Sequence, residues 1–345
     1  MFALRSVRKE DLNDLFELSK LMNFINLPSD KDLLQEKIKS SVESFRNPSK
    51  NLSENYYIFI LEDLTSAKII GVSMIHAKHG TKEEPHFFLK LGTEEKKSTT
   101  LKKTYSHKTL KLGYETNGYS EIGGLVLNPD YRGNKDKLGK QLSFIRFLYM
   151  GLNSNRFTEQ IHSELMPPLD EKGNSPLWDA IGEKFFHMDY KKADLLSLSN
   201  KEFILNLYPS EVIYESLLPQ SAKEVIGQVG PYTKPVKKML ESIGFKFMEE
   251  VDPFDGGPHY RVPLNQIKPI REMIKGVITN DQHYDEKNAK QLLISLSSEV
   301  DEFYSTKILA NIHQIDKENV TIVVKPDQFR YFDMKKDQTF SGIFL

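Results

Sequence analysis

The stretch of residues 120–149 constrains the fold of this chain most strongly. It begins with residues 120–127, whose apolar composition predicts a buried strand, and Asn128-Pro129-Asp130 then predicts a turn. Apolar residues between positions 138 and 149 follow at the 3.6-residue spacing of a helix. A strand that passes through a turn into a helix is typical of chains that combine sheet and helices around one core.

The turn in this stretch has the features of an anion site. Gly133 and Gly139 flank a lysine-rich segment that leads into the predicted helix. Backbone N–H groups at a glycine-bearing turn and at a helix N-terminus attract anions, and Arg132 and Lys140 add positive charge suited to a pyrophosphate. The edge of the preceding strand offers backbone groups to an extended ligand. Taken alone, the same residues also fit an ordinary strand–turn–helix with a basic surface.

Hydrophobic periodicity elsewhere predicts a mixture of strands and helices, so we expect an α/β (α+β) fold. The clearest helix begins after Thr233 and ends at Gly244, before a strand at residues 245–251. Residues 83–115 are rich in lysine and threonine and predict edge strands with a solvated, mobile loop. Residues 286–303 have a helical pattern.

Composition excludes several classes of protein. The 345 residues contain no cysteine, which excludes a disulfide framework, a thiolate zinc site and a cysteine nucleophile. Lysine and arginine number 47 against 48 acidic residues, so neither a nucleic acid nor a membrane surface is an expected partner. No apolar run approaches the roughly 20 residues that span a bilayer. We therefore expect a cytoplasmic protein whose partner is a small molecule or another protein.

Five short segments give the chain a specific resemblance. They follow one another between residues 120 and 260, and the N-terminal opening is also similar. The segments are Ser120-Glu121 with residues 125–132, Ser175-Pro176-Leu177-Trp178, Phe185-Phe186-His187-Met188-Asp189-Tyr190, Val225-Ile226-Gly227-Gln228-Val229, and Phe254-Asp255-Gly256-Gly257-Pro258. In this combination the chain resembles the arginine N-succinyltransferases.

The resemblance implies a tandem N-acetyltransferase-like (GNAT) fold, with mixed central sheets flanked by helices. It divides the chain into a first GNAT-like half with the CoA-binding loop at residues 1–155, a second half at 156–265, and a small α/β extension at 266–345. It also implies succinyl-CoA as donor, the α-amino group of L-arginine as acceptor, and a possible homo- or hetero-oligomer. The residues expected to hold CoA are Leu125, Val126, Leu127, Arg132, Gly133, Gly139 and Lys140.

The chain departs from the family at one position. The family places a histidine, the proton donor, directly after Val-Ile-Gly-Gln-Val, whereas this chain has Gly230 there. Glycine cannot transfer a proton, and general acid–base catalysis contributes roughly 10²–10⁴-fold to rate. The activity is therefore in doubt.

Three residues are candidate replacements for the missing proton carrier. His259 follows the Gly-Gly-Pro turn and titrates near neutral pH, and Tyr232 lies two residues from Gly230. Glu164 matches a family glutamate and could accept a proton or bind a guanidinium. Each residue also has an interpretation without a catalytic role: His259 as a loop histidine, Tyr232 as a surface tyrosine and Glu164 as a solvated carboxylate. Asp255 is expected either to hold the cationic substrate or to fix its turn.

Other histidines lack a spacing that indicates a metal site, so no metal is expected. Direct attack of the amine on the thioester fits, because no covalent nucleophile is evident. Two alternatives remain open: a transferase for a different amine acceptor, and a catalytically silent CoA-binding subunit that pairs with an active homologue.

Overall fold

The computed structural model describes residues 1–345 except 22–26, 198–199, 281–282, 297–301, 315 and 317. The chain divides into two compact units that interleave along the sequence. Unit 1 comprises residues 1–78, 120–159 and 263–345, and unit 2 comprises residues 79–119 and 160–262. The expected division at residues 155 and 265 into two halves and an extension stays a prediction. No helix among the described residues is long and apolar enough to cross a membrane.

Unit 1 contains a sheet with the strand order β12-β15-β11-β14-β13-β1-β2-β3-β6. Its strands are β1 (Phe2–Ser6), β2 (Tyr56–Asp63), β3 (Lys68–His79), β6 (Tyr119–Leu127), β11 (Ile274–Thr279), β12 (Lys290–Leu296), β13 (Tyr304–Gln314), β14 (Val320–Val324) and β15 (Thr339–Phe344). Its α-helices are α1 (Leu12–Lys20), α2 (Lys31–Arg46), α3 (Leu138–Leu152), α10 (Lys268–Arg271) and α11 (Pro326–Tyr331).

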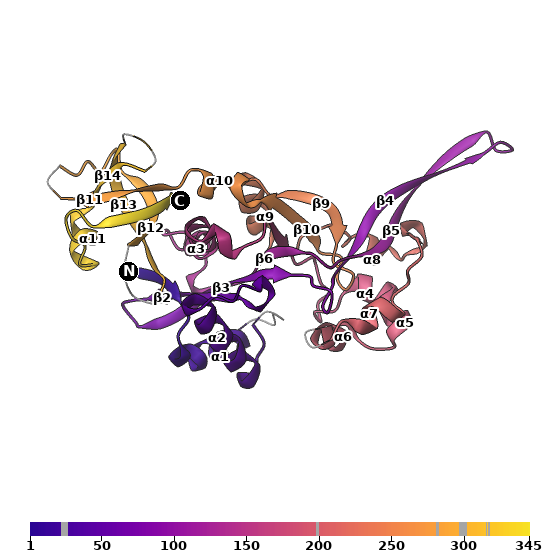
Figure 1. Cartoon of the computed structure of the whole chain (residues 1–345). Helices are drawn as coiled ribbons and strands as arrows, with labels where there is room; N and C mark the ends of the chain where they lie inside the picture. The colour runs from indigo at the N-terminus through magenta and orange to yellow at the C-terminus, as the bar shows by residue number, and fades with distance from the viewer. Residues whose placement is uncertain (22–26, 198–199, 281–282, 297–301, 315, 317) are drawn as a thin grey trace. The chain divides into compact units, whose positions relative to one another are not determined.

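Helices cover both faces of the N-terminal strands of unit 1. Figure 1 shows α1 and α2 on one side of β2 and β3, and α3 on the other. Alternate residues of β2 explain this layering: Ile58 and Ile60 belong to the core under α1 and α2, whereas the ring of Phe59 packs against Tyr149 of α3. The hydroxyl of Ser73 on β3 donates to the carbonyl of Leu142, which ties α3 to the sheet.

The C-terminal strands of unit 1 close on themselves. β12 pairs with both β13 and β15, so strands β11 to β15 form a small barrel with its own apolar core. The helix expected at residues 286–303 is wrong, because residues 290–296 form β12. A short apolar run has no decisive period, and pairing with two neighbouring strands selects the extended form. Residues 297–301 of that prediction lie outside the described residues.

Unit 2 has the strand order β7-β10-β9-β4-β5-β8. Its strands are β4 (His86–Ser98), β5 (Lys103–Glu115), β7 (Gln160–Glu164), β8 (Ile213–Tyr214), β9 (Lys246–Val251) and β10 (Pro258–Pro263). Its α-helices are α4 (Pro176–Ala180), α5 (Gly182–Phe186), α6 (Tyr190–Ser197), α7 (Glu202–Leu207), α8 (Gln220–Lys223) and α9 (Lys234–Ser242).

An aromatic stack forms the centre of the unit 2 core. Trp178 is fully buried, and its ring stacks on Phe186 and Phe254. Ser175 begins α4, because its side chain accepts from the Trp178 amide at 3.0 Å, as expected for a serine before a helix-initiating proline. Trp178 therefore packs α4 into the core of unit 2.

The lysine-rich segment of unit 2 is not a loop. β4 and β5 pair antiparallel over their full length of 13 residues each, and the hairpin projects beyond its sheet (Figure 1). Only the base of the hairpin is buried, at residues such as Phe87, Leu89 and Leu110. The edge strands expected within residues 83–115 are therefore confirmed, whereas the expected loop is limited to the turn between β4 and β5, and the outer part of the ribbon is exposed.

Candidate functional site

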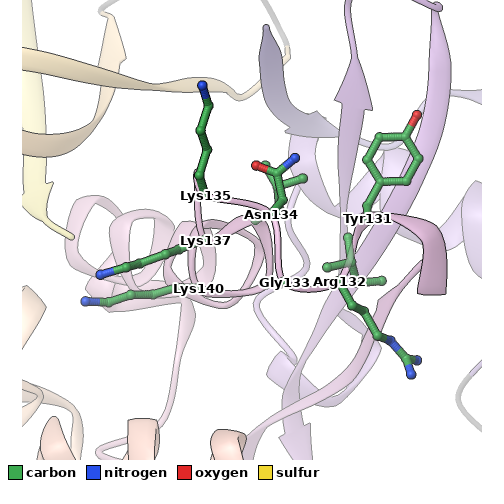
Figure 2. Close-up of a pocket in the computed structure, with 10 residues that line it drawn as sticks. Tyr131, Arg132, Gly133, Asn134, Lys135, Lys137 and Lys140 are labelled. Carbon is green, nitrogen blue, oxygen red and sulfur yellow. The ribbon is translucent and has the colours of Figure 1, made fainter.

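The turn between β6 and α3 encloses a pocket of about 490 Å³, within the usual range for ligand sites. The residues that line it are Leu127, Tyr131, Arg132, Gly133, Asn134, Lys135, Lys137, Leu138, Gly139 and Lys140. Figure 2 shows Lys137 and Lys140 extending from one side of the turn and Arg132 from the other. The pocket therefore collects four cationic side chains around exposed backbone.

Local hydrogen bonds fix the shape of this turn. Asn128 accepts from the Asp130 amide, and Asn134 accepts from the Asp136 amide, each through its side-chain oxygen. The side chain of Gln141 donates to the Asp136 carbonyl at 2.8 Å, and Lys307 forms an ion pair with the Asp136 carboxylate at 2.6 Å. The turn is thus held in place before any ligand binds, which reduces the entropic cost of binding.

Backbone groups at the start of α3 are open to a ligand. No side-chain hydrogen bond caps the helix at Lys137. A side chain at Gly133 would meet nothing within 4 Å, and one at Gly139 only Leu127 at 3.9 Å, so neither backbone is covered. The first N–H groups of a helix lack intrahelical partners and carry partial positive charge. This arrangement suits an anion.

The cationic side chains of the pocket raise the local positive potential. Burial, together with the charges of Lys137 and Lys268, lowers the pKa of Lys140. A group whose pKa is lowered by neighbouring cations is stabilised in its charged form when an anion binds beside it. The electrostatics of the pocket therefore favour phosphate groups.

β6 is distorted just before the pocket. Gly124 has a φ of +54°, and a side chain there would approach Met74 within 2.6 Å, so glycine is required at this position. The guanidinium of Arg146 on α3, fully buried, donates to the carbonyl of Gly123 at 3.1 Å and holds the distortion in place. Such irregularities free backbone groups from the regular ladder of a sheet.

The structure brings most of the expected CoA residues together. Leu127, Arg132, Gly133, Gly139 and Lys140 all line the pocket. Leu125 and Val126 do not, and the Val126 side chain is buried in the core under α1 and α2. Because successive side chains of a strand point to opposite faces, only backbone groups of Val126 are suited to a ligand.

In unit 2, Gly230, where the resemblance implies a proton donor, lies against the end of β7. The Gly230 amide donates to the Met166 carbonyl at 2.9 Å. A side chain at Gly230 would place its Cβ 3.0 Å from the carbonyl oxygen of Pro167. The Gly227 amide donates to the Gly256 carbonyl at 2.9 Å. Two of the segments that carried the resemblance, residues 225–229 and 254–258, are therefore neighbours in space.

The turn at residues 252–257 is built by two aspartates. Asp252 accepts from the amides of Phe254 and Asp255 at 2.7 and 3.0 Å, and Asp255 accepts from the Gly257 amide at 2.7 Å. A side chain at Gly257 would lie 2.5 Å from the Leu165 carbonyl oxygen, so the turn packs tightly against β7. The turn role expected for Asp255 is observed, and it uses only one of the two carboxylate oxygens.

Carboxyl groups accumulate around this turn. Burial and the charge of Glu164 raise the pKa of Asp252 to about 7, and burial and the charge of Asp252 raise the pKa of Asp194 to about 7. Burial and Asp252 also raise the pKa of Asp255, whose carboxyl is hydrogen-bonded to Tyr190. Repulsion between carboxylates is relieved when a cation binds among them. This part of unit 2 is thus suited to a cationic group.

Glu164 and His259 belong to a second cluster, which also contains His86 and His162. Oxygen Oε1 of Glu164 lies 3.5 Å from His86 Nδ1, 3.4 Å from His162 Nε2 and 3.7 Å from His259 Nε2. The three histidine side chains are at most 2% exposed, whereas that of Glu164 is 30% exposed. Burial and the neighbouring imidazoles hold the pKa of His86 well below its usual value, so this ring is neutral.

Tyr232 differs from the other candidates because its side chain is 84% exposed. Sequence reasoning missed His86, Asp194 and Asp252 as members of these clusters. The alternation His162-Ser163-Glu164 was an available signal, since residues two apart on a strand share a face. No local sequence signal indicated that β4 would contribute His86 and α6 would contribute Asp194, because these placements depend on strand order and helix packing.

The chain is similar to known proteins both in sequence and in structure. A sequence model described as "Arginine N-succinyltransferase beta subunit" matches residues 2–269. The chain is 34% identical to the arginine N-succinyltransferase of Yersinia enterocolitica over 92% of this chain and 91% of that protein. It is 33% identical to that of Shigella dysenteriae over 79% of each chain. It superposes on the solved arginine/ornithine succinyltransferase subunit AI from Pseudomonas aeruginosa with a TM-score of 0.81 and 24% identity, covering 100% of this chain and 98% of that one. The last similarity confirms the expected mixed α/β fold.

Proposed function

The chain belongs to the arginine N-succinyltransferase family, and we propose that it transfers the succinyl group of succinyl-CoA to the α-amino group of L-arginine. The observation that carries the proposal is the family match over residues 2–269, combined with a preformed cationic pocket at the turn where the family resemblance places CoA.

The pocket of unit 1 is assigned to the donor. The pyrophosphate of CoA fits the exposed backbone at Gly133 and Gly139, with Arg132 and Lys140 supplying charge. The distorted edge of β6 before the pocket accepts the pantetheine arm through its backbone groups. Leu125 and Val126 are assigned to this arm through backbone contacts only.

The carboxyl cluster of unit 2 is assigned to the acceptor. Asp252 and Asp255 each use Oδ1 in the turn, and the carboxyl of Asp255 is also hydrogen-bonded to Tyr190. A guanidinium or ammonium group is assigned to the other oxygen of Asp252 and would share the carboxyl of Asp255 with Tyr190. Burial and mutual repulsion raise their pKa values in the ligand-free protein, and a cationic substrate relieves that repulsion. Charge-assisted pairing of arginine with carboxylates is among the strongest hydrogen bonding in proteins.

The reaction forms a C–N bond and breaks a C–S bond. The neutral amine attacks the thioester carbon, the tetrahedral intermediate expels the CoA thiolate, and the amine loses its proton. A thiol with a pKa of about 8.5 leaves readily as the thiolate, and an α-amino group with a pKa of about 8 has a useful neutral fraction near pH 7. Proximity and backbone donors to the oxyanion supply much of the rate, so the reaction proceeds without the histidine that Gly230 replaces.

The proton of the amine still needs an acceptor. Glu164 is assigned this role because its carboxylate is partly exposed beside three buried imidazoles, one of which is His259. Tyr232 is the weaker candidate, since its side chain is largely exposed to solvent. The cytoplasmic location expected from composition stays a prediction.

Release of thiol from succinyl-CoA tests the proposal. Purified protein is supplied with L-arginine, L-ornithine, L-lysine or no amine, and thiol is followed with a chromogenic disulfide. The proposal predicts release that requires arginine. Release with another amine alone would establish a different acceptor.

A second candidate function rests on Gly230 itself. Loss of the family's proton donor is what a silent CoA-binding subunit would display. In that case CoA binds, no amine supports release by this chain alone, and activity appears only on mixing with an active homologue.

A further inference from the structure

Three histidines and one glutamate of unit 2 converge on a single point. His86 begins β4, His162 and Glu164 lie two residues apart on β7, and His259 lies on β10. One ligand atom from each residue can be chosen so that all four lie within 4.8 Å of one another. The rings of the three histidines are 4.7 to 5.1 Å apart between centroids. Strand pairing, rather than a flexible loop, therefore sets the geometry of the cluster.

The distances within the cluster match metal coordination better than hydrogen bonding. A good N–H···O bond has a donor–acceptor distance of about 2.7 to 3.2 Å. The distances from Glu164 Oε1 to His162, His86 and His259 nitrogens are 3.4, 3.5 and 3.7 Å. Ligands at about 2.0 to 2.1 Å from a tetrahedral ion lie about 3.3 to 3.4 Å from each other. The three distances from Glu164 are close to the edges of such a tetrahedron, and the ligand atoms of all four residues lie within 4.8 Å of one another.

Burial and charge also suit an ion. The histidine side chains are at most 2% exposed, and a neutral buried imidazole is the form that binds metal. Glu164 supplies the one negative charge among the four, and its 30% exposure leaves a path from solvent. The single carboxylate also partly neutralises a divalent cation that would otherwise be costly to bury.

We propose that His86, His162, Glu164 and His259 form a binding site for a divalent transition-metal ion of the Zn²⁺ or Co²⁺ class. Three imidazoles and one carboxylate are donors that these ions accept, whereas Mg²⁺ and Ca²⁺ require a shell of oxygens. The bound ion ties β4, β7 and β10 together beside the turn at residues 252–257. Metal binding is measured without the acyl-transfer reaction, but the ion would occupy the Glu164 carboxylate to which the proposed function assigns the amine proton. The proposal also revises the expectation of no metal.

The contacts of Arg261 support an alternative arrangement, in which hydrogen bonds hold the cluster and no metal ion is bound. Its Nε donates to His162 Nδ1 at 3.3 Å, and its guanidinium forms an ion pair with Glu250 and lies over the Tyr119 ring. In that arrangement His162 carries its hydrogen on Nε2 and donates to Glu164, which is a hydrogen-bonded cluster without an ion. When a metal occupies Nε2, His162 carries its hydrogen on Nδ1, and Arg261 loses this hydrogen bond but keeps its ion pair with Glu250 and its contact with the Tyr119 ring.

Metal binding by the full-length chain, purified without a polyhistidine tag and stripped with a chelator, tests the site. Addition of Co²⁺ to the wild type is expected to give the intense visible absorption of tetrahedral cobalt, saturating at about one ion per chain. Zn²⁺ is expected to displace Co²⁺ and to raise the melting temperature.

Variants locate the ion. His259→Gln and Glu164→Gln, which keep side-chain size, are expected to weaken Co²⁺ binding about 100-fold or more, since even second-shell changes cost 10- to 100-fold. His313→Gln, a change at an exposed histidine of β13, is the matched control and is expected to bind as the wild type does. Wild-type protein that binds Co²⁺ no more tightly than His259→Gln, or only with the weak spectrum of octahedral cobalt, would overturn the proposal. The wild-type spectrum decides the question even where a variant fails to fold.

Discussion

The amide of Gly230 donates to the carbonyl of Met166 at 2.9 Å, two residues beyond Glu164 on the chain. This bond holds the family's proton-donor position against the end of β7. A Cβ added at Gly230 would lie 3.0 Å from the Pro167 carbonyl oxygen, which is tighter than ordinary van der Waals contact. The missing imidazole and the two clusters of unit 2 therefore belong to one neighbourhood of that unit.

Gly230→His restores the residue that the family resemblance places here. We expect kcat to rise by about 10²-fold, because a positioned acid–base group contributes roughly 10²–10⁴-fold. Crowding of the Cβ is expected to cost about 1–3 kcal/mol of unfolding free energy. Steady-state kinetics and thermal unfolding measure the two effects. Gly230→Ala is the control, because it adds the Cβ without the imidazole; equal kcat values for the two variants would contradict the prediction.

Lys140→Ala removes one cation from the pocket between β6 and α3. We expect the KM for succinyl-CoA to rise about tenfold with little change in the KM for arginine, since a hydrogen bond to a charged group contributes about 1.5–3 kcal/mol. The difference in the KM for succinyl-CoA between Lys140→Ala and the wild type is expected to shrink at high ionic strength, where charge interactions are screened. Lys39→Ala, at an exposed position of α2, is the control. An unchanged KM in low salt would remove Lys140 from the donor site.

Much of the fold was predictable because its signals are local. The strand Phe2–Ser6 and the hairpin of β2 and β3 have the apolar and turn patterns that the structure confirms. Thr233 does precede α9, but its side chain makes no capping hydrogen bond. The lysine-rich composition of residues 83–115 did not predict the length of the β4–β5 ribbon, since the ribbon depends on cross-strand pairing rather than on burial.

The candidate sites also differ in how far local sequence signals could predict them. The pocket lies on one continuous segment, so Gly133 and Lys140 could be identified from spacing and charge. The histidine cluster assembles three strands, β4, β7 and β10, that the chain order does not place together. His86 had no sequence signal, because only the strand order brings it beside His259.

Asp255→Asn tests the acceptor site. The substituted side chain keeps an oxygen for the Gly257 amide, so the turn is preserved while the charge is lost. We expect the KM for arginine to rise about tenfold and the KM for succinyl-CoA to stay constant, which a charge-assisted contact of roughly 1.5–3 kcal/mol supports. Asp14→Asn, at an exposed position of α1, is the matched control. Equal KM values for arginine in both variants would exclude Asp255 from the acceptor site.

Stability should depend on pH through Asp194. Burial and Asp252 raise its pKa from 3.8 to about 7, so the folded chain retains a proton that the unfolded chain releases. The stabilisation is complete below about pH 4 and is lost as the pH rises through about 7, with an upper limit of about 4 kcal/mol that partial exposure reduces. Urea unfolding of ligand-free protein between these pH values measures the slope. Asp194→Asn is expected to flatten it, and an unchanged slope in this variant would contradict the assignment.

We expect this chain to succinylate arginine although Gly230 stands where the family resemblance places the proton donor. Mass spectrometry of a reaction containing purified protein, succinyl-CoA and L-arginine tests it most directly. We expect N2-succinyl-L-arginine and free CoA in equal amounts, formed only when protein is present. Tight binding of succinyl-CoA with no succinylarginine, under conditions where an active homologue forms it, would contradict the claim.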